Sequence, residues 1–241
     1  MFDAFEAPYD GDDLNSVRRL MNHGPAPIRD QSVGPLFDYP SLGIWGGPSQ
    51  SFDVVALDFE TTGLSPKKDR VIEVGLARLS HSRELVAQFS TLVNPGLATT
   101  GAGVKGIAAS AFDGAPSFEE IYDTICEFLD GAVVVAHNAP FDEWFLGNEC
   151  VRAGLPLPRN HAIDTLWLSK KAMYHPNRNT LGRVAGRLDV DPYKPHTALG
   201  DVWTMLDVLL AILKRGPQFH WSRQLPLESR LPQIRCHAKE R

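Results

Sequence analysis

Two acidic residues, Asp58 and Glu60, stand near the end of the apolar stretch VVALDFETTGL at residues 54–64. Residues two apart on a β-strand point to the same face, so both carboxylates are expected to project together. Two carboxylates held so close repel each other unless one is protonated or a cation lies between them. Mg²⁺ or Mn²⁺, which prefer oxygen ligands, is the simplest such cation. For this pair alone, an exposed strand end facing water is at least as good an explanation.

Two further stretches supply acidic residues in separate settings. In VVVAHNAPFDEWF (133–145), an apolar strand leads through a short turn into a helix, and Asp142 lies at the expected helix start. In KPHTALGDVWTML (194–206), His196 stands at or just before a helix start and Asp201 follows five residues later. Separately, Asp142 could simply stabilise a helix terminus and His196 could be an incidental surface residue. Beside several carboxylates and metal ions, His196 would be the side chain suited to taking a proton from water.

The elements that must position these residues follow from the hydrophobic pattern. Three β-rich stretches at 52–60, 70–79 and 84–95, separated by the turn-rich SPKKD and SHSR, predict an antiparallel three-stranded meander. Ser117 and Glu120 form a capping-box signature for a helix that ends near Leu129. The stretch AVVVAHN is typical of a short strand buried on both faces. Further helices are predicted at about 141–153, 164–174, 180–188 and 197–214, which indicates an α/β fold with a mixed sheet flanked by helices.

Composition and charge divide the chain into three parts. With 241 residues, 43% of them hydrophobic, the chain can bury the core of one catalytic-sized domain, predicted at 51–215. Residues 1–50, with seven Asp/Glu against three Lys/Arg, are predicted to be an extension or linker. Its hydrophobic residues could pack on the domain or on a partner: Phe37, Leu42, Ile44 and Trp45. Residues 216–241 form a basic tail, either a solvated end or a phosphate-binding arm.

Several classes of protein are disfavoured. A net charge of −5 argues against binding nucleic acid through bulk electrostatics. Cys126, Cys150 and Cys236 lack the spacing of a zinc site or a disulfide framework, which favours two core thiols and one tail thiol in a reducing compartment. The N-terminus has no basic and apolar signal pattern, and no stretch approaches ~18 uninterrupted apolar residues. A soluble cytoplasmic protein without a membrane partner is therefore expected.

The three motifs together resemble a known family. The order D-x-E-T-T-G, H-N-A-x-F-D and H-x-x-x-x-D is similar to the DEDDh group of DnaQ-like 3′→5′ exonucleases, which includes the proofreading subunits of bacterial polymerases. The resemblance covers about residues 52–214 and implies a ribonuclease H-like fold. It also implies that four acids hold two Mg²⁺ or Mn²⁺ ions and that His196 is the general base. The acids are Asp58, Glu60, Asp142 and Asp201.

The resemblance also implies substrate contacts. Residues Thr61, Thr62, Gly63 and Leu64 match the segment that contacts the terminal nucleotide in this family, with Leu64 against the base. Asn138 and Phe141 match positions that line the substrate cleft. For Thr61 to Leu64 the alternative is a plain turn, and for Phe141 the alternative is a phenylalanine of the core. The chain departs from many relatives at 105–107, where it has Lys-Gly-Ile in place of His-Gly-Ile, and this leaves the details of substrate binding open.

The implied function is removal of nucleoside 5′-monophosphates from single-stranded or frayed DNA 3′ ends, in proofreading or repair. The alternatives are an RNA-trimming exonuclease and a non-catalytic nucleic-acid-binding module. The segment ETTGL is closer to the proofreading type than to the oligoribonuclease type, which usually has a methionine there. In the tail, QLPLE at 224–228 loosely resembles peptides that bind sliding clamps, so a DNA polymerase or a clamp is a candidate partner.

Overall fold

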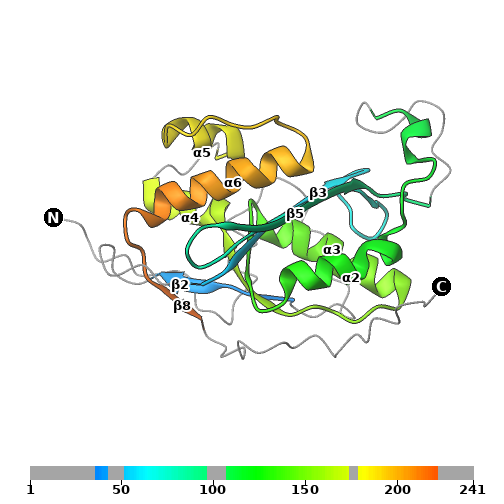
Figure 1. Ribbon diagram of the computed structural model, residues 1–241, viewed down its shortest axis with the longest axis horizontal. Helices are drawn as coiled ribbons and strands as arrows, with labels where there is room; N and C mark the ends of the chain where they lie inside the picture. The colour runs from blue at the N-terminus through cyan, green and yellow to red at the C-terminus, as the bar shows by residue number, and fades with distance from the viewer. Residues whose placement is uncertain (1–35, 43–51, 97–106, 174–178, 222–241) are drawn as a thin grey trace.

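The computed structural model describes residues 36–42, 52–96, 107–173 and 179–221. Its centre is a six-stranded mixed sheet with the strand order β1-β7-β6-β3-β4-β5. Helices cover both faces of this sheet, so the fold has three layers (Figure 1). The predicted α/β class with a mixed sheet is therefore confirmed.

The first half of the sheet is the predicted antiparallel meander. It consists of β3 (Val54–Thr61), β4 (Val71–Leu79) and β5 (Leu85–Leu92). β4 lies in the middle and most of its side chains are buried, whereas β5 forms one edge and alternates between exposed and partly buried side chains. The register pairs Asp58 with Gly75 and Glu60 with Glu73. The two acids of the first motif therefore lie beside the middle of β4.

The second half of the sheet is parallel. β6 (Val133–Ala136) pairs with β3, β7 (Asn160–Asp164) pairs with β6, and β1 (Phe37–Asp38) pairs with β7. All four residues of β6 are buried, as predicted for a strand covered on both faces. β7 was not predicted, because its sequence NHAID is short and polar at both ends. Parallel strands end at the same edge, so the segments that follow β3, β6 and β7 meet there.

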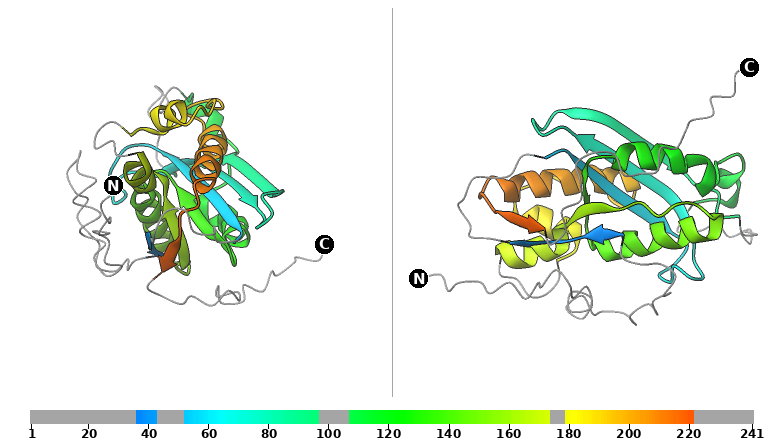
Figure 2. Two further views of the ribbon diagram at one scale, coloured as in Figure 1. Left: turned by 90° about the vertical axis from the view of Figure 1, so that its left-hand side faces the viewer. Right: turned by 90° about the horizontal axis from the view of Figure 1, so that it is seen from below.

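The helices form two layers. α2 (Phe118–Leu129) and α3 (Ala139–Ala153) lie on one face, and α6 (Ala198–Leu213) packs across β3 and β4 on the other. α4 (Thr165–Met173) and α5 (Leu181–Arg187) pack against α6 (Figure 2). A short 3₁₀ helix, η1, spans Ala109–Phe112. The predicted helices are confirmed with ends displaced by up to about two residues, and the capping box of Ser117 and Glu120 is present.

The folded unit extends beyond the predicted boundaries of 51–215. β1 belongs to the main sheet, and β2 (Pro40–Leu42) pairs antiparallel with β8 (Phe219–Trp221). The sequence pattern missed these strands because each has only two or three residues. Phe37 and Leu42 pack on the core, which confirms one of the two predicted alternatives for them. Ile44, Trp45 and the QLPLE segment lie outside the described residues.

Two of the three cysteines are core thiols, as predicted. Cys126 and Cys150 are buried and free, and burial raises the pKa of the first to about 11 and of the second to about 12. Cys236 lies outside the described residues. Among the helices that the structure describes, none has the length and apolar character needed to cross a membrane.

A buried carboxylate attaches the N-terminal segment to α3. Glu143 is 2% exposed, and its Oε1 accepts hydrogen bonds from the backbone N–H groups of Leu36 (2.8 Å) and Phe37 (3.1 Å). Its Oε2 accepts a hydrogen bond from the Tyr39 hydroxyl at 3.1 Å. Charge-assisted hydrogen bonds of this kind are among the stronger ones in proteins. Residues 36–39 are therefore fixed to the helix that also carries Asp142.

The Glu143→Ala variant should be much less stable than the wild-type protein. The change leaves two backbone N–H groups without their acceptor in the core, so the free energy of unfolding should fall by about 3 kcal/mol. Urea denaturation followed by circular dichroism measures this difference. Glu127→Ala, at an exposed position of α2, is the matched control and should change stability by less than about 0.5 kcal/mol.

His137 joins three elements as a neutral side chain. Its Nε2 lies 2.8 Å from the Asn179 carbonyl oxygen and its Nδ1 lies 2.9 Å from the Thr165 hydroxyl. Because a carbonyl oxygen only accepts, Nε2 carries the proton and Nδ1 accepts from Thr165. Burial lowers the pKa of His137 to about 4. The ring thus links the end of β6 to the start of α4 and to the segment before α5.

The stabilisation by His137 should depend on pH. The folded protein keeps the ring neutral down to about pH 4, whereas the unfolded chain takes up a proton near pH 6.5. The contribution is therefore complete above pH 6.5 and should be lost as the pH falls towards 4, by up to about 3 kcal/mol. The difference in unfolding free energy between the wild type and His137→Gln, measured in urea from pH 4 to 7, isolates this residue. A difference that stays constant with pH would contradict the assignment.

Candidate active site

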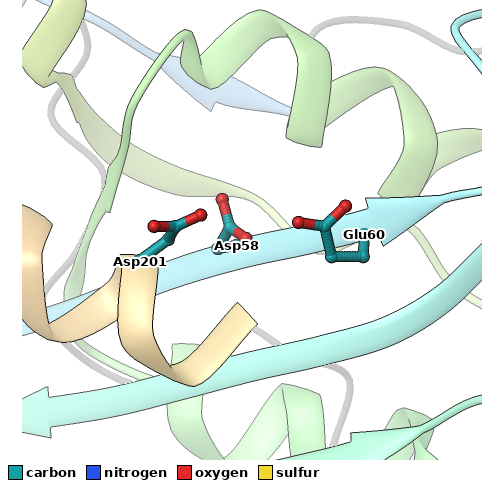
Figure 3. Close-up of side chains that lie close together, drawn as sticks. All are labelled: Asp58, Glu60 and Asp201. Atoms are coloured by element: carbon teal, nitrogen blue, oxygen red, sulfur yellow. The ribbon is translucent and has the colours of Figure 1, made fainter. Parts of the chain in front are cut away.

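Three carboxylates converge above β3. Asp58 and Glu60 from β3 and Asp201 from the first turn of α6 each place one oxygen within 4.8 Å of the others. In Figure 3 the three side chains point into the same space between the strand and the helix end. The period of two along β3 puts the first pair on the face that α6 covers. Oxygen ligands at this spacing suit a hard divalent cation such as Mg²⁺ or Mn²⁺.

Asp142 approaches the same strand from α3. It lies in the first turn of that helix, is 3% exposed, and accepts a hydrogen bond from the Phe59 backbone N–H at 3.1 Å. Phe59 stands between Asp58 and Glu60, so Asp142 is directly beside the strand that carries them. It is not one of the three carboxylates that lie within 4.8 Å of one another.

Negative charge is concentrated at this site. Burial raises the pKa of Asp58 well above its ordinary value, and the neighbouring Asp142, Asp201 and Glu60 raise it further. Burial likewise raises the pKa of Asp142, which the hydrogen bond from Phe59 partly opposes. Each carboxylate makes ionisation of the others more costly, and a bound cation would reverse this effect. The donor set and its charge therefore fit divalent metal ions.

His196 lies next to Asp201 in a left-handed backbone conformation. Its φ is +61°, and its side chain is exposed two residues before α6 begins. Burial and Glu60 raise the pKa of Asp201, whereas the charge and the backbone N–H of His196 lower it. The structure thus brings His196 to the side of the cluster that is open to water. A non-glycine residue in this conformation is uncommon and is held there by its surroundings.

The turn after β3 presents Leu64 to solvent. Thr61 is buried and its hydroxyl donates to the Gly63 carbonyl at 2.6 Å, while the Thr62 hydroxyl donates to Asp69 at 3.2 Å. A Cβ at Gly63 would lie 2.5 Å from the Asp69 carboxylate, so a side chain at this position would displace the group that accepts the hydrogen bond from Thr62. Leu64, by contrast, is 80% exposed. The threonine side chains therefore hold the turn, and Leu64 is its exposed apolar side chain.

An ion pair fixes the end of this turn to α3. Glu149 is 1% exposed and accepts hydrogen bonds from the Arg70 guanidinium (2.9 Å) and from the Val71 backbone N–H (3.1 Å). Arg152 forms a second ion pair with Glu149 at 3.1 Å and donates to the Pro66 carbonyl. The turn is therefore held against the same helix that carries Asp142.

Asn138 and Phe141 begin α3 beside the carboxylates. Asn138 has φ +72° and its backbone N–H donates to Asp164 Oδ1 at 3.0 Å. Phe141 is half-buried and its ring lies 4.8 Å from the ring of Phe145, centre to centre. Its ring thus packs in part on the core, which was one of the two sequence interpretations, and is in part accessible.

Sequence reasoning missed two acids near the site. Asp164, at the end of β7, accepts hydrogen bonds from the backbone N–H groups of Asn138 and Leu166, and burial raises its pKa to about 6. Glu73, on β4, accepts a hydrogen bond from the Ala198 backbone N–H. The signal for Glu73 was an acid within the apolar stretch RVIEVGLARL. Asp164 belongs to the strand that was not predicted.

Comparison with known proteins agrees with this geometry. The sequence model of the RNase T family, described as Exonuclease, matches residues 55–209. A PolC-type DNA polymerase III of Caldanaerobacter subterraneus subsp. tengcongensis is 33% identical over 165 residues, which are 68% of this chain and 12% of that protein. A DNA polymerase III subunit epsilon-like protein of Rhodobacter capsulatus is 32% identical over 213 residues, or 83% of this chain and 30% of that protein. The chain thus matches only a minor part of each relative.

Solved structures share the fold. The nuclease domain of 3′hExo, a DEDDh family member bound to rAMP, superposes with a TM-score of 0.61 at 19% identity and covers 74% of this chain and all of that domain. Exonuclease I superposes with a TM-score of 0.59 at 16% identity and covers 69% of this chain and 42% of that protein. The predicted ribonuclease H-like fold is therefore confirmed. The family match, which spans more than half of the chain, shows that the chain belongs to the RNase T family of exonucleases.

Proposed function

We propose that this protein is a 3′→5′ exonuclease that uses two divalent metal ions to remove nucleoside 5′-monophosphates from DNA ends. The observation that carries the proposal is the convergence of Asp58, Glu60 and Asp201 within 4.8 Å. Asp142 beside the same strand and His196 at its open side complete the set of groups that such hydrolysis needs. A non-catalytic binding module would have no use for three converging acids with a fourth, Asp142, beside the same strand, so this alternative is disfavoured.

The residues divide the work of hydrolysis between them. Asp58, Glu60, Asp142 and Asp201 would hold Mg²⁺ or Mn²⁺, which when bound stabilises negative charge on the attacking and leaving oxygens at phosphorus. A ring nitrogen of His196 takes the proton from the water that attacks the terminal phosphodiester. The water oxygen forms a bond to phosphorus while the bond between phosphorus and the 3′ oxygen of the shortened strand breaks, and that oxygen takes a proton from solvent water to become a hydroxyl.

The exposed turn supplies a surface for the terminal nucleotide. In the proposal Leu64 packs against the terminal base, and the backbone of 61–63 lines the same end of the site. Asn138 and the accessible side of Phe141, at the start of α3, are proposed to line the substrate cleft as well. Apolar contact with a base is tolerant of sequence because every base has an apolar face. The proposed enzyme therefore removes nucleotides with little preference for the base.

DNA is the proposed substrate and RNA is the alternative. The names of the curated relatives, PolC-type DNA polymerase III and an epsilon-like subunit, favour DNA and a polymerase context. The solved structures include a 3′-exonuclease that recognises a histone mRNA stem-loop, which keeps RNA as the second candidate. A polymerase or sliding clamp that binds the tail remains a proposal from the QLPLE sequence.

A digestion experiment tests this function directly. Single-stranded DNA and RNA oligonucleotides of matched sequence, labelled at the 5′ or the 3′ end, are incubated with Mg²⁺, with Mn²⁺ or with a chelator. The 5′-labelled DNA should shorten in single-nucleotide steps from its 3′ end only when metal is present. Asp201→Asn, which removes a charge but little volume, should lower the rate by at least about 100-fold.

The outcomes separate the candidate functions. Faster digestion of RNA than of DNA would select the RNA-trimming alternative. Binding of both oligonucleotides without cleavage by the folded wild-type protein, with metal present, would favour the binding module. Glu127→Ala provides the control, because its exposed side chain lies on α2, on the other face of the sheet.

Loss of the proposed base should slow chemistry without removing metal. His196→Ala should lower kcat by about 100-fold or more, since general base catalysis contributes that much in other enzymes. Mn²⁺ affinity, measured by calorimetry, should stay within about threefold of the wild type because the acids remain. An unchanged kcat at neutral pH would exclude His196 as the base.

A further inference from the structure

The first turn of α6 is held by a carboxylate from the sheet. The first N–H groups of a helix have no partner within the helix and need acceptors from elsewhere. Thr197 Oγ1 accepts from the Gly200 N–H at 3.2 Å, and Glu73 Oε1 accepts from the Ala198 N–H at 3.3 Å. Glu73 therefore bonds directly to the helix start that follows His196.

The helix start lies against β4 with no space between them. A Cβ added at Gly75 would lie 2.4 Å from the Ala198 carbonyl carbon and 2.7 Å from the Leu199 nitrogen. Glu73 and Gly75 are two residues apart and face the same side of the strand. Glu73 thus supplies the hydrogen-bond acceptor, and Gly75, which has no side chain, leaves room for the helix backbone. The position of Ala198 relative to β4 is fixed by both.

The residues of β3 that pair with Glu73 and Gly75 are proposed metal ligands. Glu60 pairs with Glu73, and Asp58 pairs with Gly75. Ala198 stands between His196 and Asp201 in the sequence. Any shift of the helix start along β4 would therefore move the histidine and the third carboxylate relative to the two acids of β3.

We propose that Glu73 is a positioning residue, which fixes His196 and Asp201 over β3 through its hydrogen bond to Ala198. This inference rests on the proposed exonuclease function. Glu73 acts through the acceptor oxygen and not through its negative charge. It is not part of the group of carboxylates within 4.8 Å, whose members are Asp58, Glu60 and Asp201.

Two substitutions of Glu73 distinguish a role as hydrogen-bond acceptor from a role that depends on its negative charge. Glu73→Gln keeps an oxygen acceptor and the shape of the side chain, whereas Glu73→Ala removes both. In Glu73→Ala, kcat should fall about 10- to 100-fold and Mn²⁺ affinity should fall by more than about threefold, because both the proposed base and the ligand Asp201 are displaced, while KM for a DNA oligonucleotide stays within about threefold. Glu73→Gln should keep kcat within about threefold of the wild type. Glu127→Ala serves as the control for loss of a glutamate elsewhere.

Hydrogen exchange provides a readout that needs neither metal nor substrate. In the metal-free protein, the Ala198 amide should exchange faster in Glu73→Ala than in the wild type and stay protected in Glu73→Gln. Unchanged exchange in Glu73→Ala would overturn the inference even if the wild type proved inactive, so this result is independent of the proposed function. Equal loss of kcat and of Mn²⁺ affinity in both variants would also overturn it, because Glu73 would then act by its charge as a metal ligand.

Discussion

Mutual repulsion of the carboxylates is the constraint that the rest of the structure must satisfy. Asp58, Glu60 and Asp201 come from two elements far apart in the sequence, and burial makes the charges of Asp58 and Asp201 more costly. Left alone, such groups would separate. The strand fixes two of them at a spacing of two residues, and the contact of α6 with β4 brings in the third. Holding these carboxylates close together therefore lowers the stability of the fold when no cation is bound.

The elements around the site are held together by the same kind of interaction. Buried or half-buried carboxylates accept hydrogen bonds from backbone N–H groups at the start of a segment, and each carboxylate ties two parts of the fold together. Glu143 holds the N-terminal segment, Glu149 the start of β4, Asp164 the start of α3, and Glu73 the start of α6. Such bonds have strict geometry, whereas apolar contacts tolerate sliding. The apolar core gives the fold its stability, and these acids set the positions within it.

The sequence predicted the elements with strong periodicity and the acids at their ends. Asp58 and Glu60 could be found because an apolar strand that ends in two acids is unusual, and Asp201 because it followed His196 at a helix start. β7 could not be found, since five residues with polar ends give no clear period. The role of Glu73 needed the strand register and the approach of α6, which are tertiary features. β1, β2 and β8 depend on partners that no local pattern indicates.

The pairing of β2 with β8 bears on how the chain reaches this fold. Ser41 and His220, whose side chain and backbone meet across these strands, are 179 positions apart. A contact of such sequence separation forms late, because closing the long intervening segment costs conformational entropy before the contact can stabilise the fold. The meander of β3 to β5, by contrast, is built from local contacts and can form early. Asp58 and Glu60 thus stand on the part that can fold first, whereas Asp201 reaches them only through a long-range contact, so catalytic competence should arise at a late stage of folding.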